Sequence, residues 1–339
     1  MIHDNLEFYN VAELVAQENT SGLRLQRVPE SVRAQLDEGT AGTMLSPANC
    51  EIRFRLTDDS ESVTLTLSSD GGAQVYIYHG PFQGQMFTIG DDPTDIVIKP
   101  HKRLALLSSE QANEYRYHPD LVRVCFGDDY PEPITYLGHQ GGVLPPRKSD
   151  TPEKTYLAYG SSITHGIKAS GAALSYPAHV AWKKNMNLRN LGASGCCLCE
   201  PAMGDFLAEQ DCDLMTLELS VNMLGRGIGG EEFKQKAEDL VRKVADAKPE
   251  RPVVCITIFP HYNDMGPDLI GGNETATSEE YRDILRSIVN ELDRPNLHLV
   301  EGPSLMTNLE DLRMDLIHPG ARGMIEIGEN LTKEISHII

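Results

Sequence analysis

Hydrophobic and polar residues alternate along the first part of the chain, between Cys50 and Phe126. Six short segments carry this pattern, each bounded by Gly, Asp or Pro residues: EIRFRL, VTLTL, QVYIY, QMFTI, DIVI and LVRVCF. In the first segment, Ile52, Phe54 and Leu56 fall on one side of an extended chain, because side chains alternate along a strand. Alternating segments separated by turn signals predict an antiparallel β-sandwich. We expect its jelly-roll version.

A polar, proline-rich segment at 142–154, GVLPPRKSDTPEK, ends this pattern and predicts a linker. A chain of 339 residues suits two domains. We therefore place the boundary near residue 150, with a β-sandwich accessory domain at 1–150 and a second domain at 151–339. The sequence leaves open whether the accessory domain binds glycan, covers an active site or mediates self-association, and it does not define the oligomeric state.

Beyond the linker, apolar strand-like segments alternate with helical ones. The predicted strands are KTYLAYG, CDLMTLELS, RPVVCITIFP and NLHLVEG. We predict Ser278 as the N-cap of one helix, Pro319 as the start of the last, and Trp182 as a core residue of an amphipathic helix. Two apolar helix faces comprise Phe233, Ala237, Leu240, Val241 and Val244, and Tyr281, Ile284, Leu285, Ile288, Val289 and Leu292. This alternation predicts a parallel sheet that is covered by helices on both faces.

Four loops of the second domain carry polar residues where strands are predicted to end. They are GSSITHG at 160–166, NLGASG at 190–195, LELSVNM at 217–223 and DLIHPG at 315–320. In doubly wound sheets the ligand site lies at the C-terminal ends of the strands. We therefore expect all four loops to converge at one edge of the sheet.

The residues of these loops suit acyl transfer. That chemistry needs a hydroxyl nucleophile, a base to take its proton, a carboxylate that orients the base, and donors aimed at the oxyanion. Ser162 supplies a hydroxyl, with Ser161 as the fallback, and Asp315 precedes His318 by three residues. A helix-capping serine is the plain alternative for Ser162. The four loops, which occur in this order along the chain and will be called blocks, favour a catalytic site.

These blocks resemble the SGNH hydrolase superfamily, also called GDSL esterases, over residues from about 155 to 339. The first block of that family reads Gly-Asp-Ser, and Gly160-Ser161-Ser162 matches it with serine in place of aspartate. The resemblance implies that Ser162 is the nucleophile, His318 the base and Asp315 the residue that orients His318. It also implies a flavodoxin-like three-layer α/β/α domain and hydrolysis of an ester, often an acetyl ester, without a cofactor or metal.

The same resemblance implies an oxyanion hole made by the N–H groups of Ser162 and Gly195 and the side chain of Asn222. Gly192 is the less favoured choice for the glycine. Ser220 stands where the family often has glycine, which adds a side chain near Asn222. This change and the one at Ser161 are small enough to leave a working site.

Three further residues are candidate substrate contacts. His165 lies close to Ser162 in sequence, although a structural histidine is the more common case. His261 and Tyr262, in the segment FPHYND, follow a predicted strand and should overhang the same edge of the sheet; the alternative is that they are ordinary loop residues.

The order of the two domains is similar to carbohydrate esterase family two, in which a jelly roll precedes the SGNH domain, and to some polyketide-tailoring acyl hydrolases. We therefore predict a serine esterase that hydrolyses a short-chain ester, in the first place an acetyl ester, of a carbohydrate or small metabolite. The alternatives are a catalytically silent carbohydrate-binding protein and an acyl hydrolase that acts on a non-sugar natural product.

The net charge and the cysteine content of the chain bear on its expected partners and compartment. The formal charge of −20 argues against nucleic acid and against an anionic membrane surface. Seven cysteines and a start without a signal-peptide pattern predict a cytoplasmic protein with reduced thiols, although removal of a leader remains the alternative. Cys196 and Cys199 have CxxC spacing, but without a second ligand pair buried free thiols are expected.

Two rival folds fit the motifs less well. An α/β-hydrolase needs Gly-x-Ser-x-Gly and a separate loop for the acid, whereas here Asp315 and His318 share one short segment. A nucleotide-binding flavodoxin-like module needs a glycine-rich phosphate loop, for which GASG is a weak candidate, and GxxxxGK[ST] does not occur.

Overall fold

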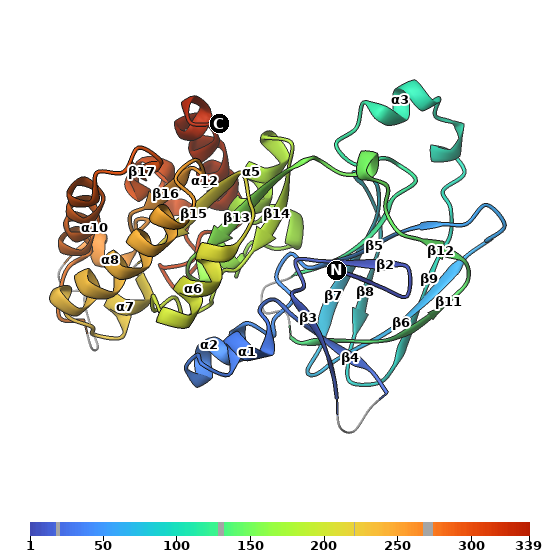
Figure 1. Cartoon of the computed structure of the whole chain (residues 1–339), viewed down its shortest axis with the longest axis horizontal. Helices are drawn as coiled ribbons and strands as arrows, with labels where there is room; N and C mark the ends of the chain where they lie inside the picture. The colour runs from blue at the N-terminus through green and yellow to red at the C-terminus, as the bar shows by residue number, and fades with distance from the viewer. Residues whose placement is uncertain (18–20, 128–131, 220, 267–273) are drawn as a thin grey trace.

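The computed structural model describes residues 1–17, 21–127, 132–219, 221–266 and 274–339. Two antiparallel sheets come from the N-terminal region, and a third, parallel sheet comes from the C-terminal part. Figure 1 shows the two antiparallel sheets on the right and the parallel sheet with its helices on the left. The predicted β-sandwich followed by an α/β/α layer structure is confirmed.

The sandwich pairs a sheet of order β1-β2-β5-β10-β7-β8, to which β12 adds beside β5, with a sheet of order β3-β4-β11-β6-β9. The strands of the first sheet are β1 (Ile2–His3), β2 (Leu6–Tyr9), β5 (Glu51–Leu56), β7 (Ala73–His79), β8 (Phe82–Ile89), β10 (Val122–Phe126) and β12 (Val143–Leu144). Those of the second are β3 (Glu13–Ala16), β4 (Leu23–Gln26), β6 (Val63–Ser69), β9 (Thr94–Ile98) and β11 (Ile134–Gln140). Three short helices accompany them: α1 (Glu30–Arg33), α2 (Glu38–Thr43) and α3 (Ser109–Asn113).

All six alternating segments of the sequence form strands, from β5 to β10. Ile52 and Phe54 of β5 and Leu65 of β6 are completely buried, because the alternation turns one side of each strand toward the facing sheet. Leu56 lies at the margin and is only partly buried. Strands β1 to β4 and β11 were not predicted.

The segment at 142–154 is more closely attached than a free linker. Its first residues form β12, which pairs with β5. Asp150 is completely buried and accepts hydrogen bonds from the backbone N–H of Arg147 (2.7 Å) and from its Nε (2.9 Å), with Arg55 Nε 3.4 Å away. These contacts hold the connection against the sandwich before the next strand begins at Lys154.

The parallel sheet has the order β14-β13-β15-β16-β17, which is the doubly wound flavodoxin-like order 2-1-3-4-5. Its strands are β13 (Lys154–Tyr159), β14 (Met186–Asn190), β15 (Leu214–Glu218), β16 (Val253–Ile256) and β17 (Leu297–Val300). The helices are α4 (Ser162–His165), α5 (Tyr176–Lys183), α6 (Pro201–Glu209), α7 (Val221–Gly225), α8 (Gly230–Ala247), α9 (Tyr262–Met265), α10 (Ser278–Leu292), α11 (Gly302–Leu305) and α12 (Ala321–Glu334).

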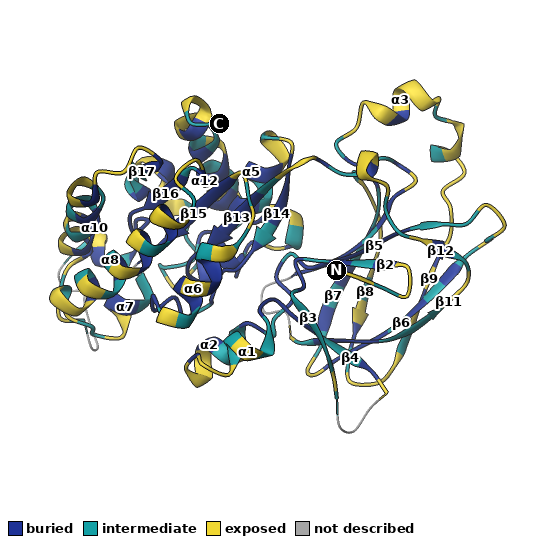
Figure 2. Ribbon diagram, in the orientation of Figure 1, coloured by how far each residue is buried: buried dark blue, intermediate teal, exposed yellow. Residues whose placement is uncertain are grey.

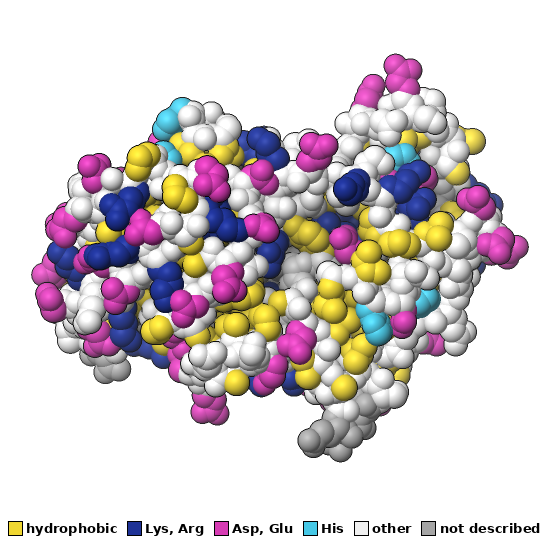
Figure 3. Space-filling view, viewed as in Figure 1, with side chains coloured by type: hydrophobic (Ala, Val, Ile, Leu, Met, Phe, Trp, Pro, Cys, Tyr) yellow, Lys and Arg dark blue, Asp and Glu magenta, His cyan; other side chains and the backbone are white. Residues whose placement is uncertain are grey.

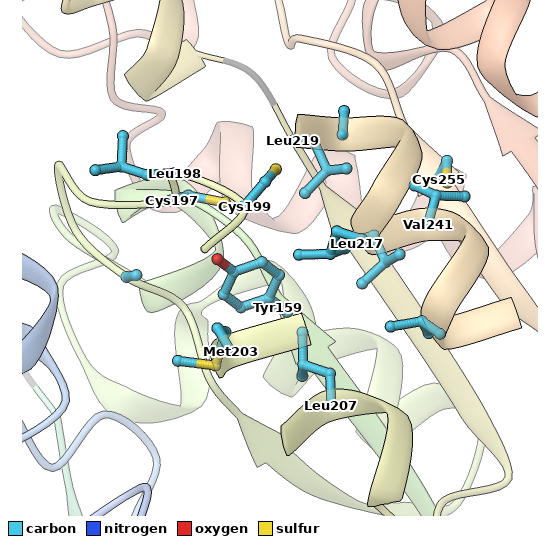
Figure 4. Close-up of a cluster of buried hydrophobic side chains, with 14 of the residues drawn as sticks. Tyr159, Cys197, Leu198, Cys199, Met203, Leu207, Leu217, Leu219, Val241 and Cys255 are labelled. Carbon is cyan, nitrogen blue, oxygen red and sulfur yellow. The ribbon is translucent and has the colours of Figure 1, made fainter. Parts of the chain in front are cut away.

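Helices cover both faces of this sheet. Side chains of α6, α8 and α10 pack with Leu157 and Tyr159 on one face, and those of α5 and α12 pack with Tyr156 and Ala158 on the other. Figure 2 shows the strands as buried, while α8 and α10 expose their outer sides. Figure 4 shows Tyr159 among sulfur-bearing and aliphatic side chains, including Cys197 and Met203. All seven cysteines are free thiols, and six of them are buried.

Three local predictions for this part were wrong. Thr277, not Ser278, caps α10, and it forms a capping box with Glu280. The last helix begins after Gly320, because the residues before it are bound in the preceding loop. Trp182 is 58% exposed rather than part of the core, since it lies on the outer side of α5.

The chain has an excess of acidic residues, with 50 Asp and Glu against 30 Lys and Arg. In Figure 3, Asp and Glu side chains are scattered among Lys and Arg over the face shown. Within the part of the chain that the structure describes, no helix is both long and apolar enough to cross a membrane.

Candidate active site

The turn between β13 and α4 gives its two serines different partners. Ser161 is the N-cap of α4: its Oγ accepts a hydrogen bond from the N–H of Ile163 (3.2 Å) and donates one to Glu218 Oε2 (2.6 Å). Ser162 is the first residue of the helix, and its Oγ lies 2.7 Å from His318 Nε2. The capping role that the sequence offered to Ser162 is therefore filled by Ser161, which leaves the Ser162 hydroxyl for the histidine.

His318 is held from its other side by Asp315. Its Nδ1 lies 3.0 Å from Asp315 Oδ2, while Asp315 Oδ1 accepts the backbone N–H groups of Ile317 (3.0 Å) and His318 (2.9 Å). Partial burial acts to raise the pKa of Asp315, but these N–H donors and the His318 ring together lower it below its usual value. The carboxylate stays ionised beside the ring, and Ser162, His318 and Asp315 form one hydrogen-bonded chain.

The loop that carries Asp315 and His318 has a tightly bonded backbone. Leu316, between them, has a φ of +57°, a left-handed conformation that is unfavourable for a residue with a Cβ. Its carbonyl accepts the N–H of Tyr262 (2.8 Å), and the N–H of Arg313 donates to the carbonyl of His318 (2.8 Å). Bonds at both ends of the loop therefore stabilise the conformation that turns His318 toward Ser162.

Gly195 and Asn222 lie on the next two loops at the same edge of the sheet. Gly195 is exposed, has a φ of +71°, and has open space where a side chain would begin. Asn222, in α7, accepts the N–H of Cys197 on its Oδ1 (3.0 Å). This bond orients the amide so that Nδ2, the donor, remains available. Ser220, the other residue of interest in this block, lies outside the described residues.

The alternative glycine, Gly192, has a packing role. Its N–H donates to Asn190 Oδ1 (2.8 Å), and a Cβ at this position would lie 2.2 Å from the backbone nitrogen of His165. Its carbonyl accepts a hydrogen bond from Arg27 Nη1 (2.8 Å). Because its N–H is already bonded, Gly192 is not available to an oxyanion.

Arg27 of the N-terminal region supports this loop, and the sequence did not indicate it. The guanidinium is buried and donates to four carbonyl oxygens, those of Thr43, Ser46, Asn190 and Gly192. Burial lowers the pKa of Arg27 to about 10, so it remains charged at neutral pH. The glycine-bearing loop of the α/β part is thus attached to the segment that follows β4.

Of the three candidate substrate contacts, the structure brings none into the chain formed by Ser162, His318 and Asp315. His165 is buried, its Nε2 lies 3.0 Å from Ser46 Oγ, and burial, followed by the charge of Arg27, lowers its pKa well below the usual value. His261 is also buried, with its Nε2 2.8 Å from Ser278 Oγ. Both rings are therefore packed inside the protein, which argues against direct contact with a substrate. Tyr262 is partly buried, and its hydroxyl donates to Glu274.

With the geometry established, comparison with known proteins identifies the family. A family described as the GDSL-like lipase/acylhydrolase family matches residues 153–336, which is more than half of the chain. The chain belongs to this family. The predicted resemblance to the GDSL esterases is confirmed.

Relatives of this GDSL-like chain carry further modules or share its whole architecture. A multidomain esterase from Ruminococcus flavefaciens is 25% identical over 134 residues, which are 39% of this chain and 16% of the relative, so the chain spans a small part of that protein's length. A salicylyl-acyltransferase from a tetracycline biosynthetic pathway has a TM-score of 0.78 at 15% identity, covering 99% of this chain and 95% of the other. A family two carbohydrate esterase from Clostridium thermocellum, in complex with cellohexaose, has a TM-score of 0.64 at 16% identity, with 86% and 93% covered. These two structures show a shared fold.

The structure also explains the main departure from the GDSL pattern. Ser161 replaces the aspartate of the first block, but Glu218, at the end of β15, places a carboxyl group at the same turn. Its Oε2 accepts hydrogen bonds from the N–H (2.7 Å) and Oγ (2.6 Å) of Ser161 and from Thr164 Oγ1 (3.1 Å). The signal in the sequence was a glutamate within the apolar strand LMTLE, where an acidic residue is unusual unless it has partners.

Proposed function

We propose that this chain hydrolyses short-chain esters, in the first place acetyl esters, of a carbohydrate through an acyl-enzyme on Ser162. The observation that carries the proposal is the hydrogen-bonded chain from Ser162 Oγ to His318 Nε2 (2.7 Å) and from His318 Nδ1 to Asp315 Oδ2 (3.0 Å). Acyl hydrolysis by a serine hydroxyl uses this arrangement of nucleophile, base and orienting carboxylate. The carbohydrate is proposed because a family two carbohydrate esterase shares the architecture.

In this mechanism His318 Nε2 takes the proton of Ser162 as its Oγ attacks the ester carbonyl carbon. Asp315 stabilises the imidazolium that forms, because its carboxylate is ionised and 3.0 Å from Nδ1. His318 then gives the proton to the departing alcohol. A water molecule, deprotonated by His318, attacks the acyl-enzyme and releases the carboxylic acid, and the proton returns to Ser162 Oγ.

The negative charge that develops on the carbonyl oxygen needs donors that are already in place. We assign this role to the N–H groups of Ser162 and Gly195 and to Asn222 Nδ2. The bond from the Cys197 N–H to Asn222 Oδ1 supports the assignment, because it fixes which end of the amide faces away from Cys197. The left-handed turn at Gly195 supports it as well, since no atom beyond its chain neighbours lies within 4 Å of the position that a Cβ would take there.

The test compares wild type, Ser162→Ala and Ser161→Ala on p-nitrophenyl acetate, butyrate and octanoate and on acetylated xylo- and cello-oligosaccharides. We expect hydrolysis of the acetates by wild type and a kcat reduced by about 10³-fold or more in Ser162→Ala, with unchanged folding. Ser161→Ala is the matched neighbour and should retain most of the activity. Turnover by Ser162→Ala close to that of wild type would overturn the assignment.

The same assay separates the alternatives. The similarity to a salicylyl-acyltransferase favours a test of aryl esters and of alcohol acceptors, in which transfer would appear as a new ester rather than free acid. Preference for an aryl ester over every acetylated sugar would replace the carbohydrate by a non-sugar substrate. No hydrolysis of any ester, together with no labelling of Ser162 by a fluorophosphonate, would instead indicate a silent binding protein.

A further inference from the structure

A cavity of about 260 Å³ lies between the sandwich and the α/β part, away from the residues of the proposed reaction. One wall consists of residues on and beside β5, β7 and β10, including Tyr78, Tyr117 and Arg123. The opposite wall is formed by the segment before α5, by α5 itself and by β14, and it includes Trp182. Ser162, Gly195, Asn222, Asp315 and His318 do not line it.

The charges around this cavity are not balanced. Glu51 accepts hydrogen bonds from Arg53 Nε (2.6 Å) and Arg123 Nε (2.8 Å), so one carboxylate serves two guanidinium groups. Arg53 has a second, more distant acidic neighbour in Glu7, at 3.6 Å. Both basic groups are largely covered, and Glu51 is itself buried. The single negative charge of Glu51 is therefore shared between Arg53 and Arg123.

Arg116 adds a third guanidinium that lacks an acidic partner. Its Nη2 donates to the carbonyl oxygen of Met186, but within the described part of the chain no carboxylate lies within 4.0 Å of it. Its Nε is buried without a hydrogen-bond partner. Burial, which outweighs the nearby carboxylate of Glu51, lowers the pKa of Arg116. A half-buried cation without an acidic partner carries a desolvation cost, and an anion in the cavity would offset that cost.

Most of the remaining lining is apolar or aromatic, and Asn49, Cys125 and His179 complete it. The Tyr117 ring lies beneath the guanidinium groups of Arg123 (3.8 Å to the ring centroid) and Arg116 (4.8 Å), and the ring of Trp182 forms the outer edge. Small or aliphatic residues make up most of the remaining wall: Pro81, Ala172, Ala173, Ala178, Ala181 and Leu188. An apolar cavity of about 150 Å³ is known to hold benzene, so 260 Å³ accommodates a ring with a few further atoms.

We propose that this cavity binds a small organic anion that joins a carboxylate to a planar apolar body, as benzoate does. The carboxylate would bind the guanidinium of Arg116, which lines the cavity, because the planar guanidinium matches a carboxylate in shape and charge. The ring would lie between the aromatic residues and the alanines of α5, where water is displaced. The site is separate from ester hydrolysis and does not depend on it.

Trp182 is the single tryptophan of the chain, so intrinsic fluorescence reports on this cavity. The experiment titrates the full chain with benzoate, benzyl alcohol and acetate, with excitation selective for tryptophan. We expect a saturable change with benzoate, with a Kd at least about tenfold below that of benzyl alcohol, which lacks the charge, and of acetate, which lacks the ring. Equal binding of benzyl alcohol, or no saturable change with benzoate, would refute the site.

Two variants test the cavity by different means. Arg116→Gln removes the charge and should weaken benzoate binding at least about tenfold, whereas Arg242→Gln, on the exposed side of α8, should leave it unchanged. Ala178→Leu keeps every charge and fills the space, so it should also abolish binding. Circular dichroism and hydrolysis of p-nitrophenyl acetate check that the variants are folded. Wild-type affinity in both Arg116→Gln and Ala178→Leu would show that the anion binds elsewhere.

The catalytic site is the competing location for a carboxylate. Benzoate resembles a product of ester hydrolysis, so the titration is repeated after Ser162 has been blocked with a fluorophosphonate. We expect the affinity to be unchanged, because none of the lining residues belongs to the hydrogen-bonded chain at Ser162. Loss of binding after the block would assign the anion to the catalytic site and overturn the proposal.

Discussion

Glu218 allows a quantitative prediction, because it is completely buried and its carboxyl group is held in a known set of bonds. Oε2 accepts three hydrogen bonds, from Ser161 and Thr164, while Oε1 is buried without a partner. Burial raises the pKa of Glu218 from its usual 4.5 to about 7, although the bonds from Ser161 and Thr164 act in the opposite direction. Protonation on Oε1 leaves the three accepted bonds intact, so the folded protein holds this proton more tightly than the unfolded chain does.

The sign of the effect on stability follows from proton binding. Between pH 4.5 and 7 the folded state retains the proton that the unfolded state has released, so the free energy of unfolding decreases as the pH rises. A pKa that differs by one between the two states corresponds to about 1.4 kcal/mol, so this single group removes about 2 to 3 kcal/mol between pH 5 and pH 8.

The assay is urea unfolding of wild type and Glu218→Gln at pH 5, 6, 7 and 8, followed by circular dichroism. The glutamine oxygen can accept the same three bonds and does not titrate, so the variant should lose about 2 to 3 kcal/mol less than wild type across this range. Glu153→Gln, at an exposed position, serves as the control and should follow wild type. Parallel curves for wild type and Glu218→Gln would refute the reasoning, because the carboxyl group would then titrate alike in both states.

Three further substitutions test how the site is built. Gly160→Ala would place a Cβ 2.2 Å from Thr164 Oγ1. We expect the free energy of unfolding in urea to fall by about 1 to 3 kcal/mol and kcat to decrease. An unchanged stability would contradict the close packing. Arg27→Met would leave buried carbonyl oxygens unpaired, with an expected destabilisation of about 3 kcal/mol that calorimetry can measure, and a wild-type Tm would show that the four bonds are not needed. Asp315→Asn should lower kcat by about 10²- to 10⁴-fold at a nearly unchanged Tm, because it alters the tautomer of His318; full activity would exclude an orienting role.

Much of the fold could be predicted because its signals are local. The alternation in β5 to β10 and the helical spacing in α8 and α10 each lie within one element, and burial follows them residue by residue. Strands β1 to β4 have two to four residues each, too few for a period to be recognised, and β2 and β4 pair with β5 and β11, which are far away in the chain. The cap of α10, Thr277, was missed by one residue and the first residue of α12, Ala321, by two, because the choice of cap depends on local bonds that a pattern does not specify.

By itself, the sequence determined the order of strands and helices and the identity of Ser162, Asp315 and His318 as candidates, since these depend on short-range periodicity and on motifs. Only the tertiary structure decided which serine is left for the histidine, because Ser162 and His318 are 156 positions apart and Ser161 is bonded to Glu218 of another strand. The support of the Gly192 loop by Arg27 and the unpaired charge of Arg116 likewise arise where the two parts of the chain meet. Contacts of this kind join residues that are distant in sequence, and burial then fixes their protonation and their hydrogen bonds, which no local pattern records.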